Sequence, residues 1–342
     1  MRQRIAIRAN AGVSIGFGHI RRCISLADAL IARGADVLFL VNPESNPSEW
    51  AMELPRHHAA VLEVPAHEAE TLAETHIHTR AQRASALVLD SYDVSLQALA
   101  NALVPVVSII DAPPVEPLPV ALVVNGGAEA EDVPHPLAPD SRALLGPRYV
   151  LLRPGFAGIE RDPIRPEVRE VLVMCGGSDS RAVSVVLARA ARAARPAAAL
   201  TVVAGPYFPS SVIESLELET ARYGHSRVVH YPSNLIELMR AADLAVTTGG
   251  QTTYELAACG TPTVAVLVAA NQAANLRGLQ ARGTLIWAGD ADIVNLESAV
   301  SERLRTLATD RNARETMSIA GCRAVDGHGA DRVAQEVLRL CA

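Results

Sequence analysis

The sequence predicts an α/β protein with two doubly wound domains, each built on a parallel β-sheet that is covered by helices. Three observations predict this fold class. Short continuous apolar runs alternate with helical patterns, as expected for strands that are buried on both faces of a parallel sheet. The alternation stops in a proline-rich stretch between residues 133 and 167 and then begins again. The length of 342 residues also exceeds the usual limit for one hydrophobic core.

The domain boundary is expected near residue 157, inside the proline-rich stretch. We therefore expect an N-terminal domain over residues 1–156, a C-terminal domain over residues 157–342 and a cleft between them. The last helix of the chain could pack back on the N-terminal domain.

The first domain begins with a strand, a loop and a helix. Residues 5–7 are apolar, and a loop of small residues follows over 9–18. Apolar residues from Ile20 to Ile31 recur at helical spacing, and Gly34 is suited to end this helix. Residues 37–41 complete a βαβ unit. Further strands are expected at 86–89, 104–110 and 120–124. Polar or glycine turns follow these strands, at the sheet edge where α/β proteins bind ligands. Asp90 and Asp111 lie in these turns, and this position alone makes them candidate active-site carboxylates.

The second domain repeats the pattern without a fixed sequence period. Strands are expected at 171–174, 200–203, 244–246 and 264–268. Helices are expected up to about Arg195, over 235–242, up to Cys259, after the turn at Asn271 and Gln272, and over 329–340.

Composition excludes several classes of protein and of chemistry. A net charge of −6 and a pI near 5.9 argue against nucleic acid as a partner. The chain has no apolar run of 18 residues, and its five scattered cysteines are typical of reduced thiols, so we expect a cytoplasmic protein without a signal peptide or a membrane span. We expect neither a cofactor nor a metal, and the protein could be a monomer, although the sequence does not give the oligomeric state. All 31 basic residues are arginine, which excludes a Schiff-base lysine and a P-loop lysine.

A glycine-containing loop in the first domain carries the candidate base. Gly16, Gly18 and His19 lie between the first strand and the first helix, but Arg21 occupies the third glycine position of a dinucleotide fingerprint. At a helix N-terminus the dipole disfavours the imidazolium, so His19 could accept a proton. The alternative is a histidine that only caps or packs.

Two glycine turns in the second domain are candidates for binding a diphosphate. Residues 176–178 and 249–253 each follow a buried strand and open a helix, so their backbone N–H groups could cradle phosphates. Glu255 could then hold a ribose diol. The alternatives are ordinary turns and an acid that complements the helix dipole.

Several motifs, in order along the whole chain, resemble one family. They are IGFGHIRR, LDSYDVS, VLVMCGGSDS, LMRAADLAVTTGGQTTYELAACGTPTVAV and NQAAN. Together they resemble the UDP-sugar hydrolases of pseudaminic acid biosynthesis, the PseG family, which is related to the MurG-like glycosyltransferases of the GT-B fold.

The resemblance implies a GT-B fold and the metal-independent, inverting hydrolysis of UDP-2,4-diacetamido-2,4,6-trideoxy-β-L-altropyranose to UDP and free sugar. It gives His19 the role of the base that activates water, and it places Tyr92 in the pocket. The residues that it implies for binding the UDP-sugar are Gly16, Gly18, Arg22, Asn125, Gly176, Gly177, Ser178, Asp179, Gly249, Gly250, Gln251, Thr252, Thr253, Glu255, Asn271 and Gln272.

Two positions depart from the family pattern, and two other functions stay open. Asn10 and Ala112 stand where aspartates are common, which leaves the exact sugar less certain than UDP. A GT-B glycosyltransferase would use His19 to activate an acceptor hydroxyl, and a binding protein would hold a UDP-sugar without turnover. The acidic, histidine-rich stretch 42–78 lacks the basic docking patch of such transferases and favours the hydrolase.

Overall fold

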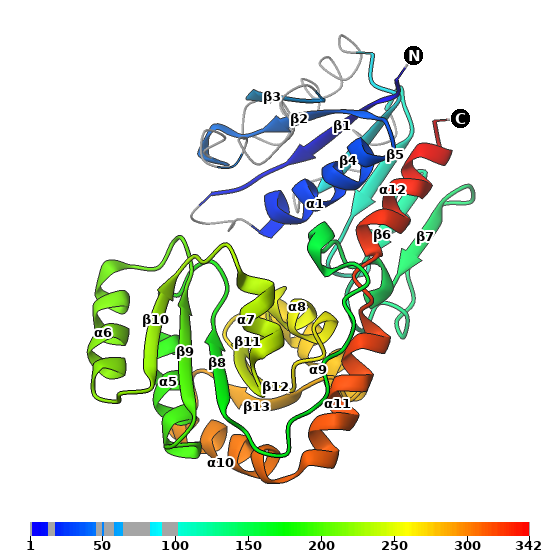
Figure 1. Ribbon diagram of the computed structural model, residues 1–342. Coiled ribbons are helices and arrows are strands. Elements are labelled where there is room, and N and C mark those ends of the chain that lie inside the picture. Colours follow the sequence, from blue (N-terminus) through cyan, green and yellow to red (C-terminus); the bar gives the residue numbers. More distant parts are fainter. Residues whose placement is uncertain are drawn as a thin grey trace. The chain divides into compact units, whose positions relative to one another are not determined.

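The computed structural model describes residues 2–12, 18–45, 50, 58–63, 83–90 and 102–341. The chain divides into two compact units (Figure 1). Unit 1 comprises Met1–Ala157 and Gly327–Ala342, and unit 2 comprises Gly158–Asp326. The chain therefore passes from one unit to the other twice, after Ala157 and after Asp326.

Unit 1 contains a parallel sheet with the strand order β3-β2-β1-β4-β5-β6-β7. Its strands are β1 (Arg4–Ala9), β2 (Asp36–Val41), β3 (Ala59–Glu63), β4 (Ala86–Asp90), β5 (Val106–Ile109), β6 (Leu122–Asn125) and β7 (Arg142–Leu145). The order reverses between β1 and β4, which is the switch point of a doubly wound sheet. Ligands of such sheets bind at the carboxyl ends of the strands beside this point.

Two helices cover one face of this sheet in the described part of unit 1: α1 (Gly18–Ala32) and α12 (Gly329–Arg339) (Figure 1). Ile20, Ile24 and Leu30 of α1 pack in one apolar core with Val333 and Val337 of α12. Gly34 ends α1 with a φ of 86°, a conformation that glycine adopts without strain, as the sequence predicted. The same unit contains the short 3-10 turns η1 (Pro43–Ser45), η3 (Pro147–Tyr149) and η4 (Pro154–Phe156).

Unit 2 contains a second parallel sheet of the same pattern, β10-β9-β8-β11-β12-β13. Its strands are β8 (Glu170–Met174), β9 (Ala199–Ala204), β10 (Ser226–His230), β11 (Leu244–Thr248), β12 (Thr263–Leu267) and β13 (Ile286–Asp290). Its helices are α5 (Val183–Ala194), α6 (Ser210–Ala221), α7 (Leu235–Ala241), α8 (Thr252–Ala258), α9 (Ala273–Ala281), α10 (Leu296–Thr309) and α11 (Arg311–Ala324), with the 3-10 turn η5 (Ala270–Gln272). The predicted fold class, two doubly wound α/β domains, is confirmed.

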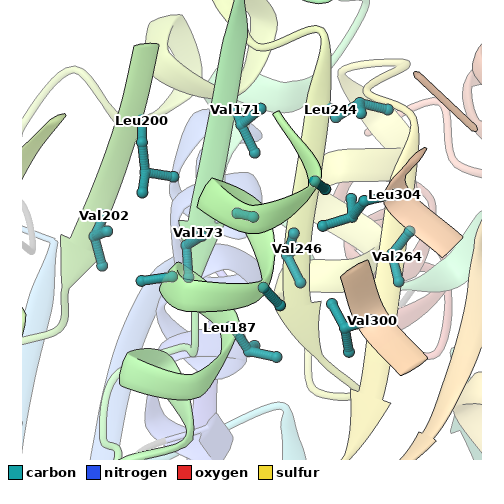
Figure 2. Packing of buried hydrophobic residues seen from close by; sticks show 14 of the residues in the cluster. Val171, Val173, Leu187, Leu200, Val202, Leu244, Val246, Val264, Val300 and Leu304 are labelled. Atoms are coloured by element: carbon teal, nitrogen blue, oxygen red, sulfur yellow. The ribbon is translucent and has the colours of Figure 1, made fainter. Parts of the chain in front are cut away.

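The core of unit 2 is built from alternate residues of the central strands (Figure 2). Val171 and Val173 of β8 and Val246 of β11 lie against Leu187 of α5 and Leu304 of α10. These side chains are almost completely buried, because the helices cover this face of the sheet.

Four strands were not expected from the sequence: β3, β7, β10 and β13. All four lie at sheet edges, and all four carry partly exposed residues. An edge strand has a neighbouring strand on one side only and is partly open to solvent. It therefore lacks the continuous apolar run that marks a central strand. β7 also lies inside the proline-rich stretch, which the prediction had treated as a boundary alone.

No helix among the described residues is long and apolar enough to cross a membrane.

The unit 2 core gives a direct test of the packing. Leu187→Ala should lower the free energy of unfolding by about 2–5 kcal/mol, because it leaves a cavity at a side chain that is 0% exposed. Leu218→Ala is the matched control, since Leu218 is 70% exposed and its loss should cost less than about 0.5 kcal/mol. Urea denaturation followed by circular dichroism measures both. Equal costs for the two variants would contradict this assignment of the core.

Candidate active site

A cluster of charged side chains lies at the carboxyl ends of β4 and β5 in unit 1. It consists of His19 and Arg22 of α1, Asp90 at the end of β4 and Asp111 just after β5, and we refer to these four residues as the His19 cluster. His19 and Asp90 are buried, with 6% and 0% of each residue exposed. The cluster therefore lies beside the switch point of the sheet.

His19 and Asp90 form a buried dyad. His19 Nδ1 lies 2.6 Å from Asp90 Oδ1. Burial alone would raise the pKa of Asp90, but Arg22 and His19 outweigh it and hold this pKa at about 2. Asp90 is therefore an ionised carboxylate that can only accept, so Nδ1 carries the proton and donates it to Oδ1. In the neutral ring the lone pair then belongs to Nε2, which is the nitrogen that can take up a proton.

Arg22 holds the other side of the Asp90 carboxylate. Its Nε and one terminal nitrogen donate to the two oxygens of Asp90, both at 2.6 Å, and its other terminal nitrogen donates to Asp111 Oδ1 at 2.5 Å. Burial lowers the pKa of Arg22, yet the two carboxylates more than compensate and raise it above its usual value. The guanidinium is thus committed to two carboxylates.

Arg22 also lies 3.1 Å from His19 Nδ1. Because Nδ1 donates to the closer, ionised Asp90, this approach places two donors side by side and is not a hydrogen bond to the ring. The thiol of Cys23 completes the surroundings of Asp90, with its Sγ 3.4 Å from Oδ2. Burial, and next Asp90, raise the pKa of Cys23, so it remains a thiol.

Of the other residues predicted for the first domain, Gly16 and Tyr92 lie outside the described residues, and Gly18 is the first residue of α1. Asn125 is buried and shapes its own loop: its Oδ1 accepts from Gly127 N at 2.9 Å, and its Nδ2 lies 3.0 Å from His135 Nε2. Nδ1 of the same ring is 3.0 Å from Val133 O, so it carries the proton, and Nε2 accepts from Asn125.

The first glycine turn of unit 2 follows β8. It is closely approached by the loop after β9, where a Cβ on Gly205 would lie 2.4 Å from the carbonyl oxygen of Gly176. Gly177 and Ser178 are exposed, whereas Asp179 is buried and accepts from the N–H groups of Val183 and Ser184 at 2.9 and 2.7 Å. The Asp179 carboxylate therefore already occupies the N-terminus of α5, which disfavours a second anion on those two groups.

The second glycine turn of unit 2 follows β11 and leads into α8. Thr253 Oγ1 donates to Gly250 O at 2.7 Å, and Asn275 of α9 donates to Gly249 O at 2.9 Å. Tyr254 donates its hydroxyl to Asn275 Oδ1. Asn275 therefore braces the turn. It is the last residue of the NQAAN motif, from which the sequence prediction took only Asn271 and Gln272 as site residues.

The remaining predicted contacts lie around the same sheet edge. Gln251 and Glu255 are partly exposed and Thr252 is buried, all near the start of α8. Asn271 is exposed in η5, and Gln272 accepts from Val268 N at 3.2 Å through Oε1. Among the described residues, no group of three or more histidine, cysteine, aspartate or glutamate side chains could hold a metal ion.

No protein-family model matches the chain. Spore coat polysaccharide biosynthesis protein SpsG of Bacillus subtilis is 24% identical over 197 residues, 57% of either chain. The UDP-N-acetylglucosamine–N-acetylmuramyl-(pentapeptide) pyrophosphoryl-undecaprenol N-acetylglucosamine transferase of Salinibacter ruber is 35% identical over 120 residues, 33% of this chain and 31% of that one. The matches thus span about half and about a third of these two curated relatives.

Solved structures match over almost the whole chain. MurG of Acinetobacter baumannii covers 99% of this chain and 100% of its own, with a TM-score of 0.68 and 14% identity. The glycotransferase of kitacinnamycin covers 99% of both chains, with a TM-score of 0.69 and 17% identity. The fold is therefore of the GT-B type, as expected.

These comparisons correct the expected activity. The sequence prediction of a UDP-sugar hydrolase is contradicted, because the similar proteins whose names state an activity are an N-acetylglucosamine transferase and a glycotransferase. What they show is a fold of the GT-B type, and none of them is a member of the narrower family of pseudaminic acid hydrolases by its name. The motifs around His19 did not distinguish the two reactions, since both need a base that deprotonates an oxygen nucleophile.

The low pKa of Asp90 predicts how stability depends on pH. A carboxylate with a folded pKa of about 2, against 3.8 ordinarily, stabilises the fold above pH 4 and loses this contribution as the pH falls toward 2. The loss should amount to about 2 kcal/mol. Urea midpoints between pH 5 and pH 2 should fall less steeply for Asp90→Asn than for the unchanged chain and for the exposed control Asp140→Asn. Parallel curves for all three would contradict the ion pair.

Proposed function

We propose that this protein is a GT-B glycosyltransferase that moves a sugar from a UDP-linked acetamido sugar to an acceptor hydroxyl. The observation that carries the proposal is the buried His19–Asp90 dyad, which presents Nε2 as a proton acceptor. The partial match to a UDP-N-acetylglucosamine-dependent transferase supports the donor class, and so do the two glycine turns of unit 2.

In the proposed reaction His19 Nε2 removes the proton of an acceptor hydroxyl as its oxygen attacks the anomeric carbon. The bond between this carbon and the β-phosphate oxygen breaks, and UDP leaves with the electron pair. Attack from the face opposite the leaving group inverts the anomeric configuration. The proton remains on the imidazole, and the adjacent ionised Asp90 stabilises the imidazolium.

Unit 2 would bind the nucleotide. The exposed turn Gly177–Ser178 and the turn over residues 249–253 offer backbone N–H groups and hydroxyls to the diphosphate. Glu255 would hold the ribose diol, and Asn271 and Gln272 would face the sugar and its phosphate. Diphosphate is a good leaving group when such donors stabilise it, so the reaction does not require the lysine that the chain lacks.

Three residues first assigned to UDP receive other roles in this proposal. Arg22 donates to Asp90 and Asp111. Asn125 accepts within the loop after β6, and Asp179 accepts at the N-terminus of α5. We propose that they hold the site in shape and do not contact the nucleotide.

Removing the base should slow transfer strongly and spare nucleotide binding. His19→Ala should lower kcat by about 10²–10⁴. The Kd for UDP, measured by calorimetry, should stay unchanged, because the nucleotide is bound by unit 2. UDP release is measured with a panel of UDP-linked acetamido sugars, with and without hydroxyl acceptors. The control is His230→Ala, whose imidazole is exposed and pairs with Glu217. Near-wild-type turnover of His19→Ala would refute the assignment.

Loss of the brace on the second turn should weaken UDP binding. Asn275→Ala removes the hydrogen bond to Gly249 O and should raise the Kd for UDP about tenfold, the effect of roughly 1.4 kcal/mol. Asn312→Ala, on the exposed face of α11, is the control and should leave the Kd unchanged. An unchanged Kd for Asn275→Ala would remove this turn from the nucleotide site.

A further inference from the structure

Arg22 connects two carboxylates of very different exposure. The Asp90 side chain is 0% exposed, and the Asp111 side chain is 38% exposed. Both accept from the same guanidinium, one on each side of it. The inner carboxylate contacts His19. The guanidinium of Arg22 lies between the outer carboxylate, Asp111, and His19. The proposed reaction gives Asp111 no role.

We infer that Arg22 and Asp111 are positioning residues that tune, in opposite directions, the pH at which His19 takes up a proton. The inference rests on the proposed function in so far as His19 is the base. It goes further by naming two residues that act on the base through Asp90 and through their charge.

The geometry of Arg22 supports its part in this inference. Its fork fixes both oxygens of Asp90, so Oδ1 stays in line with His19 Nδ1 and the ring keeps its lone pair on Nε2. Its positive charge lies 3.1 Å from the ring and opposes the imidazolium. Arg22 therefore orients the base and places a positive charge beside the imidazole ring.

The charge balance supports the part of Asp111. With a neutral imidazole the cluster carries one positive and two negative charges, and Cys23 adds none because it remains a thiol. When His19 gains a proton, the cluster becomes electrically neutral. Asp111 thus favours the protonated state that forms during transfer. Its effect should be weaker than that of Arg22, because it is farther from the ring and partly solvated.

The test is the titration of the His19 imidazole by NMR in the full chain labelled at histidine. The chain has 10 histidines, and the His19 signal is assigned by its loss in His19→Gln. Asp111→Asn should move the midpoint of this titration down by roughly half a pH unit, and Arg22→Gln should move it up by about one unit. Arg22→Lys keeps the charge and should leave the midpoint within about half a unit of its original position, while kcat falls because the fork is lost.

The chain offers a matched pair of controls at the other end of α1. Arg33, the residue after α1, pairs with Asp331 of α12, so Arg33→Gln and Asp331→Asn remove the same charges from a pair outside the His19 cluster. Neither should shift the His19 midpoint. The Asp111 shift should also shrink at 1 M salt, where the Debye length is about 3 Å.

The outcomes separate this inference from the proposed function. A purely structural Arg22–Asp111 contact predicts no shift for Asp111→Asn, or shifts of the same sign for both variants, and either result would overturn the inference. Asp111→Asn keeps an oxygen that accepts from Arg22 at a partly exposed position, so it tests the idea even if Arg22→Gln does not fold. The titration needs no substrate, so a chain that transfers no sugar would refute the function and leave this result standing. Where transfer is observed, the acid limb of kcat/KM should move in the same directions.

Discussion

The ion pair between Asp90 and Arg22 is the interaction on which the candidate site of unit 1 depends. A carboxylate that is completely buried costs several kcal/mol unless it is paired and hydrogen-bonded on all sides. Arg22, His19 and Cys23 together meet this requirement. The three lie on α1 within five residues, so the helix must present one face to the end of β4. The contacts of the Asp90 carboxylate thus set the position of α1, the tautomer of His19 and the charge at the switch point.

The sequence predicted the central strands and missed the edges, and the physical reason lies in burial. β4, β8 and β11 are buried along nearly their whole length, so most of their residues are apolar. β10 has the sequence SRVVH, with every residue exposed or partly exposed, and its pairing with β9 is what makes it a strand. Such long-range pairing leaves little trace in a local window of sequence.

The candidate site could be predicted only in part, for a related reason. The glycine loop and the position at a helix start marked His19, but its partner Asp90 lies 71 residues away and was known only as a polar residue after a strand. Arg22, Asn125 and Asp179 have side chains suited to UDP, and only their contacts revealed that they hold carboxylates, loops and helix ends. Residue type gives the chemistry that is available, whereas the partner decides how it is used. The choice between water and a hydroxyl acceptor leaves no mark on the base itself.

The double passage of the chain between the two units has a consequence for biosynthesis. Unit 2 is one continuous segment, Gly158–Asp326, inserted into unit 1 before α12. A ribosome therefore completes every residue of unit 2 before it makes Val333 and Val337, which close the core over α1. Unit 1 therefore lacks the contacts of α1 with α12 until the end of synthesis, when all residues of unit 2 have already been made. The order of synthesis thus makes unit 1 the part of the nascent chain that most needs protection from aggregation.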